Sequence, residues 1–155
     1  MYVTIICLCS KRRANCEYLQ KFLRTLGTNV DVHVMQAVVP VLSPVTSLNK
    51  GEYGCYVSHQ QAFDQFINST HEMGMTIEDD VGIKSEDEAR LLLLRAMDEC
   101  GREAEVINLD PSLQGVAFGR VSGPFKYTGF PMVNSSVIMY TKGGAKKWLK
   151  WRPIT

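Results

Sequence analysis

The chain has 155 residues, of which 45% are hydrophobic and 21% are charged. This composition excludes a disordered or fibrous protein and predicts one compact domain over residues 1–155. Lys and Arg number 17 against 16 Asp and Glu, so the net charge provides no general attraction to nucleic acid or acidic membranes. The early apolar run at residues 2–9 precedes its basic cluster and is too short to span a bilayer. We therefore expect a soluble, non-secreted, cytoplasmic protein.

Strands and helices are predicted to alternate from the start of the chain. Residues 3–8 form a β-branched run of strand length, and apolar residues then recur at helical spacing over 16–26. Gly27 is placed to stop that helix. Residues 30–38 predict a second strand, and residues 40–51, with two prolines, predict a loop.

The alternation continues to the end of the chain. A helix is predicted over 52–67 and a strand over 73–77, and Ser85 followed by Glu88 is a capping-box pattern that starts another helix. The remaining predictions are a strand at 104–109, an irregular Gly-rich part at 112–131, a strand at 135–141 and a helix at 143–151. This pattern is typical of an α/β fold with a mainly parallel sheet covered by helices and with sites at the carboxyl ends of the strands.

The cysteines do not predict a metal site or disulfides. Their number is odd and they lack a paired zinc-ligand spacing, so free thiols in a reducing compartment are expected. Cys55 and His59 share a helical face four residues apart, but two ligands do not make a zinc site. The five cysteines are Cys7, Cys9, Cys16, Cys55 and Cys100.

Three adjacent carboxylates, Glu78, Asp79 and Asp80, follow the third predicted strand. Two carboxylates about 5 Å apart repel by roughly 3 kcal/mol at an effective dielectric near 20, so water or a cation must accompany them. Because side chains alternate along an extended backbone, Glu78 and Asp80 would point to one side and Asp79 to the other. One interpretation is a magnesium or manganese ion on Glu78 and Asp80, and the alternative is a solvated turn.

Three further stretches surround this cluster in the order seen in glycosyltransferase family 25. They are KRRANCEYLQKFL at 11–23, KGEYGCYVSHQQAF at 50–63 and SSVIMYTKGGAKKWLK at 135–150. The chain resembles that family, which includes bacterial lipooligosaccharide galactosyltransferases, over nearly its whole length. The most specific part is Gly-Glu-x-Gly-Cys-x-x-Ser-His followed by Glu-Asp-Asp. Members are usually longer, so we expect a single domain that lacks the family's usual carboxyl-terminal part.

The resemblance implies a GT-A-like, Rossmann-type αβα sandwich. It implies transfer of a hexose, with inversion, from a nucleotide sugar, commonly a UDP-hexose, to a hydroxyl acceptor on a glycan or other molecule in lipopolysaccharide biosynthesis. It also places Glu78, Asp79 and Asp80 at the family's Asp-x-Asp-like motif. There Glu78 and Asp80 would bind Mn²⁺ or Mg²⁺ to stabilise the diphosphate leaving group, and Asp79 would contact the donor.

The resemblance also implies donor contacts from the start of the first predicted helix and from the second predicted helix. Arg12 and Arg13 would hold the nucleotide or its phosphates, and Glu52, Ser58 and His59 would line the donor side of the cleft. Taken alone, the arginines favour a solvated helix start, and His59 is equally a satisfied histidine on a partly buried face. Ser58 and His59 are not a nucleophile and its base, because successive helix residues do not face each other.

The last candidates follow the fourth predicted strand. Asp110 lies at its carboxyl end, where a base could take the proton from the acceptor hydroxyl, although Asp-Pro-Ser is also a common turn opening. Asn134 and Ser135 are expected to be polar residues near the cleft. Trp148 and Trp151 are interpreted as core anchors rather than a sugar platform.

Two other classes of function remain open from the residues. The chain could be a non-catalytic descendant that binds a nucleotide sugar or a protein partner. It could also be a metal-dependent phosphoesterase or nuclease that uses the same acidic cluster. That reading lacks a second set of closely spaced acidic or histidine ligands, and the near-neutral charge argues against DNA.

Overall fold

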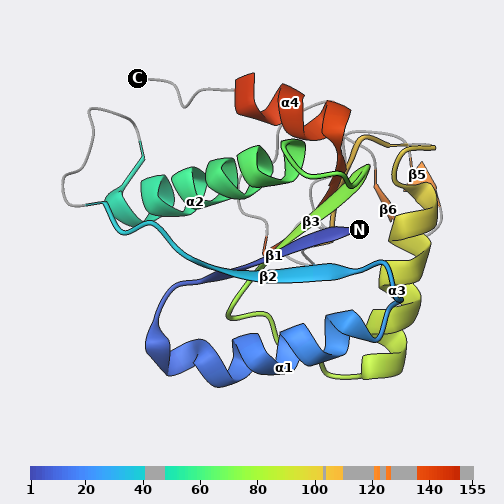
Figure 1. Ribbon diagram of the computed structural model, residues 1–155, viewed down its shortest axis with the longest axis horizontal. Coiled ribbons are helices and arrows are strands. Elements are labelled where there is room, and N and C mark those ends of the chain that lie inside the picture. The colour runs from blue at the N-terminus through green and yellow to red at the C-terminus, as the bar shows by residue number, and fades with distance from the viewer. Residues whose placement is uncertain (41–47, 103, 110–120, 123–124, 127–135, 151–155) are drawn as a thin grey trace.

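The computed structural model describes residues 1–40, 48–102, 104–109, 121–122, 125–126 and 136–150. In this part of the chain a central sheet carries helices on both sides (Figure 1). The strands of the five-stranded sheet are β1 (Tyr2–Cys7), β2 (Asp31–Gln36), β3 (Met73–Glu78), β4 (Val106–Asn108) and β7 (Val137–Thr141). The helices are α1 (Arg13–Arg24), α2 (Lys50–Ile67), α3 (Glu86–Glu99) and α4 (Lys142–Lys150), and a 3-10 turn, η1 (Ser10–Arg12), precedes α1.

The sheet is mixed, with the strand order β2-β1-β3-β7-β4. β1 pairs in parallel with β2 and β3, whereas β7 runs antiparallel to both β3 and β4. The α/β class is confirmed, but the prediction of a mainly parallel sheet is not, because the two kinds of pairing are equal in number. Parallel neighbours need a crossover, usually a helix, and the described residues between β4 and β7 contain none.

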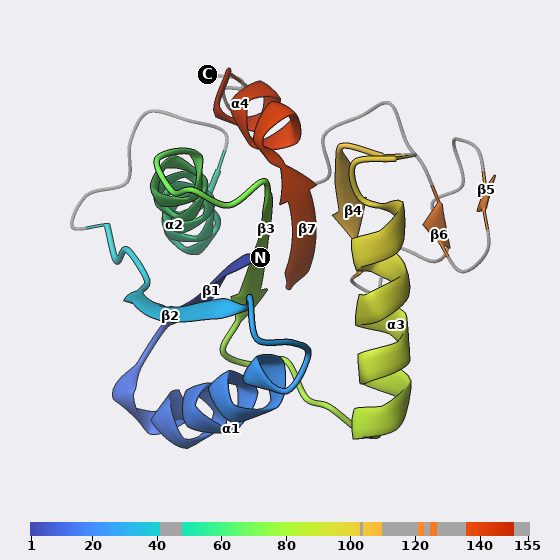
Figure 2. The same ribbon diagram turned by 45° about the vertical axis from the view of Figure 1, so that its right-hand side comes forward.

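Alternation along the strands divides the core into two layers. In β3, Met75 and Ile77 join the cluster that contains the buried residues of α1 and α3, whereas Gly74 lies against Phe66 and Tyr140 on the side of α2 and α4. Figure 2 shows α1 on one side of the sheet and α2 and α4 on the other. Helices therefore cover both faces, as predicted.

The terminal helix closes the second layer. Trp148 packs edge-on against Phe63, with ring centroids 5.4 Å apart. This contact confirms Trp148 as a core anchor, while Trp151 lies outside the described residues. No helix in the described ranges is both long and apolar enough to cross a membrane.

Most element boundaries follow the local signals, with small differences. The Ser85 hydroxyl accepts a hydrogen bond from the backbone N–H of Glu88 at 3.3 Å, which confirms the predicted start of α3. Asn49 caps α2, so this helix begins at Lys50, two residues before the predicted start. The hairpin of β5 (Val121–Ser122) and β6 (Phe125–Lys126) was not predicted.

The strand order creates a topological switch point between β1 and β3. The chain leaves β1 through α1 to add β2 on one side, then crosses through α2 to add β3 on the other side of β1. α1 and α2 consequently lie on opposite faces (Figure 1). In α/β sheets the crevice at such a switch point, outside the carboxyl ends of the strands, is where ligands bind.

Candidate functional site

A pocket of about 450 Å³ lies at this switch point. It combines apolar side chains from the segment after β2 with polar groups from α2 and the end of β3, a mixture suited to a small-molecule ligand. The lining residues are Ile6, Leu8, Arg12, Ala37, Val38, Val39, Pro40, Lys50, Gly51, Gly54, Cys55, Ser58, His59, Glu78, Asp79 and Asp80.

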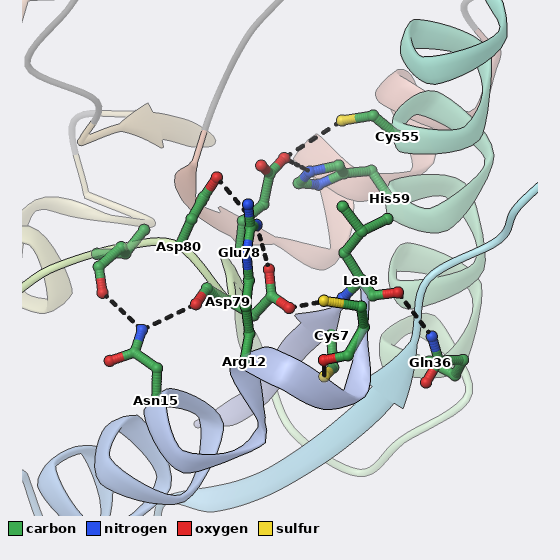
Figure 3. A network of polar contacts seen from close by, with 12 residues as sticks. Cys7, Leu8, Arg12, Asn15, Gln36, Cys55, His59, Glu78, Asp79 and Asp80 are labelled. Carbon is green, nitrogen blue, oxygen red and sulfur yellow. Dashed lines mark hydrogen bonds and ion pairs between the residues drawn. The ribbon is translucent and has the colours of Figure 1, made fainter.

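Asp79 is a buried carboxylate that joins the ends of β1 and β3. Only 2% of its surface is exposed. Its Oδ2 accepts the backbone N–H of Leu8 at 2.7 Å, and its Oδ1 accepts Nη1 of Arg12 at 2.9 Å (Figure 3). The backbone N–H of Asp79 continues the pairing with β1 by donating to the carbonyl of Ile6 at 3.1 Å. Asp79 therefore uses its side chain to hold the loop after β1 and the arginine that follows it.

Arg12 bridges two of the three adjacent carboxylates. Besides Asp79, its Nη1 lies 3.3 Å from Oδ2 of Asp80, whose side chain is 50% exposed. The hydrogen bond to Asp79 raises the pKa of the Arg12 guanidinium above its usual range, so this group stays charged. Arg12 offsets part of the repulsion within the acidic cluster and places a positive charge at the pocket.

Asn15 supports the turn that carries the acidic cluster, and it was not identified from the sequence. Its side-chain amide donates to the carbonyls of Asp79 at 2.8 Å and of Val81 at 3.0 Å. Arg12 and Asn15 are three residues apart at the start of α1, so they lie on the same side of the helix. That spacing is the signal that could have identified Asn15.

Glu78 points away from Asp79, toward α2. Its Oε1 accepts a hydrogen bond from His59 Nε2 at 3.1 Å and one from Cys55 Sγ at 3.2 Å. The bond from His59 lowers the pKa of Glu78, so Glu78 is ionised and His59 must be the donor. Desolvation, followed by the charge of Glu78, raises the pKa of Cys55 to about 12 and keeps this thiol protonated.

The three adjacent carboxylates thus have three different environments. Glu78 is held by α2, Asp79 is buried against the loop after β1, and Asp80 is half exposed beside Arg12. The predicted alternation describes Glu78 and Asp79 correctly. Asp79 and Asp80 both lie in the turn after β3, and strand alternation does not extend through this turn to fix the direction of Asp80.

Two of the candidates from the sequence, Ser58 and Glu52, serve the scaffold. The buried Ser58 hydroxyl donates to the carbonyl of Gly54 at 2.7 Å and accepts the backbone N–H of Val38 at 2.8 Å, which fastens the segment after β2 to α2. Glu52 forms a capping box with Asn49 and does not line the pocket.

Arg13 lies outside the pocket as well. Its side chain is 81% exposed and pairs with Glu17 at 3.5 Å. The structure therefore distinguishes the two adjacent arginines, with Arg12 at the pocket and Arg13 in solvent. Asp110, Asn134 and Ser135 lie outside the described residues.

Gly54 allows α2 to approach the segment after β2. A Cβ atom added there would lie 2.7 Å from the carbonyl oxygen of Val38 and 3.0 Å from Cδ of Pro40. Backbone atoms cannot move aside as a side chain can. We expect Gly54→Ala to displace this wall of the pocket and to lower the free energy of unfolding by about 1–3 kcal/mol.

Urea unfolding followed by circular dichroism tests this expectation. The matched control is Gly51→Ala in the first turn of the same helix, where an added Cβ would meet Asn49 Oδ1 at 3.4 Å, an ordinary contact distance. The control should lose no stability. Equal unfolding midpoints for the two variants would contradict the argument from close approach.

The comparison with known families agrees with this geometry. The sequence profile of glycosyltransferase family 25 (LPS biosynthesis protein) matches residues 31–115, which is more than half of the chain. The chain belongs to glycosyltransferase family 25. It is therefore a glycosyltransferase with a role in lipopolysaccharide biosynthesis, and this class of enzyme uses a nucleotide-sugar donor and an acceptor. A search of curated proteins finds no match.

The family match covers only part of the pocket. The α2 residues that face Glu78, and the acidic cluster itself, lie within the matched range of this family 25 enzyme. The first strand, Arg12 and the last strand and helix lie outside it. Arg12 is nevertheless tied to the matched range by its ion pair with Asp79.

Proposed function

We propose that this enzyme transfers a hexose from a UDP-hexose to a hydroxyl acceptor, with inversion at the anomeric carbon, in a GT-A-like fold. The observation that carries the proposal is the convergence of Arg12 and the 78–80 carboxylates on one pocket at the switch point of the sheet. The apolar segment 37–40 offers a surface for a nucleobase, and Arg12 offers a charge for the diphosphate.

The donor atoms at the pocket suit a hard divalent cation, Mn²⁺ or Mg²⁺. Glu78 and Asp80 both line the pocket with carboxylate oxygens, the ligand type that these ions prefer. Both hydrogen bonds to Glu78 use Oε1, so Oε2 has no donor among the described residues. We propose that Glu78 and Asp80 hold the ion, which, when bound, stabilises the negative charge of the leaving diphosphate.

The remaining pocket residues have separate tasks in this proposal. Arg12 binds the diphosphate through a guanidinium that the buried Asp79 keeps in place. His59 orients Glu78, and Ser58 fixes the wall at Val38. Arg13 and Glu52 receive no role in donor binding because neither lines the pocket.

The acceptor hydroxyl attacks the anomeric carbon from the face opposite the diphosphate. As the new bond forms, the hydroxyl proton passes to a base, and the bond to the diphosphate breaks. We keep Asp110 as the proposed base. Its support is its place in the sequence, directly after Leu109: β4 and β3 both run antiparallel to β7, so the carboxyl ends of β4 and β3 lie at the same edge of the sheet.

Thermal unfolding with manganese and UDP tests donor binding. A ligand that binds only the folded state at 100 times its Kd adds about 2.7 kcal/mol, which corresponds to a rise of roughly 5–10 °C for a chain of this size. We expect this rise with UDP plus manganese and a smaller one with ADP or GDP. No rise with any of these nucleotides would overturn the assignment of the pocket to a nucleotide sugar.

Release of UDP from UDP-hexoses tests the transfer chemistry separately. We expect slow, manganese-dependent release with water as the acceptor and faster release with a hydroxyl-bearing glycan. Stabilisation by UDP without release from any UDP-hexose and acceptor tried would instead favour a protein that binds the donor without turning it over.

A further inference from the structure

A thiol, an imidazole and a carboxylate meet at one wall of the pocket. Cys55 and His59 project from successive turns of α2 toward Glu78 at the end of β3 (Figure 3). One ligand atom from each residue lies within 4.8 Å of the other two. The sequence offered only the Cys55 and His59 pair, and the fold adds the third ligand.

We propose that Cys55, His59 and Glu78 form a binding site for a borderline-soft divalent cation, with zinc as the reference ion. Zinc binds cysteine sulfur, histidine nitrogen and carboxylate oxygen, and it often takes three protein ligands with water or substrate in the fourth position. A hard ion such as magnesium does not favour a thiolate, so the mixed donor set points away from it.

The observed distances are close to those of a tetrahedral site. Bonds of about 2.0–2.3 Å at tetrahedral angles place ligand atoms about 3.3–3.8 Å apart. Here Oε1 of Glu78 is 3.2 Å from Cys55 Sγ and 3.1 Å from His59 Nε2. An outward movement of a few tenths of an ångström would admit the ion. Because all three residues line the pocket, the fourth position is accessible from it.

Binding of the ion has a defined proton balance. Cys55 loses its thiol proton to solvent, and the proton on His59 moves from Nε2 to Nδ1 so that Nε2 can donate its lone pair. His59 is 6% exposed, and its Nδ1 is buried without a hydrogen-bond partner in the part of the chain described. A metal-bound histidine usually donates its other ring N–H to an acceptor, and loss of that acceptor typically costs 10–100-fold in metal affinity. We therefore expect zinc to bind about 10–100-fold more weakly here than at a site where the histidine has such an acceptor.

This site shares Glu78 with the proposed manganese or magnesium site, whose ligands are Glu78 and Asp80. Zinc on Glu78 would therefore compete with manganese on Glu78 and Asp80 and would inhibit UDP release. This consequence rests on the proposed function, whereas the binding site itself does not.

Cobalt(II) chloride added to the reduced, metal-free protein tests the site directly. Cobalt replaces zinc in such sites, and a cobalt–thiolate bond absorbs in the near ultraviolet. We expect one equivalent of cobalt to produce this band and zinc chloride to remove it. Cys55→Ser should lose the band, and both Cys55→Ser and His59→Gln should weaken zinc binding at least about tenfold.

Cys9→Ser is the matched control, because Cys9 is a partly exposed thiol outside the cluster. This variant should keep the band and the zinc affinity. A band that persists in Cys55→Ser, or cobalt binding without any thiolate band, would overturn the proposal. The titration contains no nucleotide, so its outcome is independent of UDP binding. Circular dichroism shows whether each variant is folded. If His59→Gln does not fold, Cys55→Ser decides the test, because Cys55 is exposed and its replacement should not disturb the fold.

Discussion

Asp79→Ala is expected to destabilise the protein by about 2–4 kcal/mol, because it removes a buried, charged hydrogen-bond acceptor. The carboxylate is 2% exposed and accepts the backbone N–H of Leu8 and the guanidinium of Arg12. Without it, the N–H of Leu8 has lost its partner and Arg12 keeps only the weaker contact with Asp80. Urea unfolding with linear extrapolation measures the loss.

Asp80→Ala is the matched control for stability. Asp80 is the neighbouring carboxylate, contacts the same guanidinium at 3.3 Å and is half exposed. Exposed ion pairs contribute about 0–1 kcal/mol, so this variant should unfold close to the wild-type midpoint. Equal losses for the two variants would show that burial of Asp79 does not determine its contribution.

The second large effect is expected on catalysis. Asp80→Asn should lower manganese-dependent UDP release by at least about 100-fold, the usual scale for removing a group that stabilises charge in the transition state. The physical reason is that Asp80 is the more exposed of the two carboxylates proposed to bind the manganese ion. UDP release from a UDP-hexose over a range of manganese concentrations measures the effect.

Asp87→Asn provides the control for charge. Asp87 is one of three adjacent acidic residues, Glu86–Glu88, in the first turn of α3, and it does not line the pocket. The same change of charge should leave UDP release unaltered. If Asp80→Asn retains the full response to manganese, or if Asp87→Asn loses it equally, Asp80 does not belong to the metal site.

The acidic cluster illustrates how far the sequence carries the argument. Three carboxylates after a buried strand predicted a functional site, because their repulsion requires compensation. The structure shows that Arg12 compensates Asp79 and Asp80, and that His59 and Cys55 donate to Glu78. The sequence suggested a cation shared by Glu78 and Asp80, and the fold adds protein partners for each of the three carboxylates.

The sequence by itself determined the local elements and the family. The predicted start of α3 at Ser85 was confirmed, and the strand before Glu78 formed where expected, because capping and side-chain alternation act within a few residues. The segment with Cys55 and His59 and the acidic cluster are the most specific part of the resemblance to family 25, and the profile match includes both.

Only the tertiary structure decided the direction of β7, the separation of Arg12 from Arg13, and the meeting of Cys55 and His59 with Glu78. These features join residues far apart in the chain, as in the contact between Arg12 and Asp79 across 67 positions. Periodicity and caps report the conformation of neighbouring residues, whereas such contacts depend on strand order and on which helix covers which face. The pocket is therefore a product of the packing of the sheet and its helices.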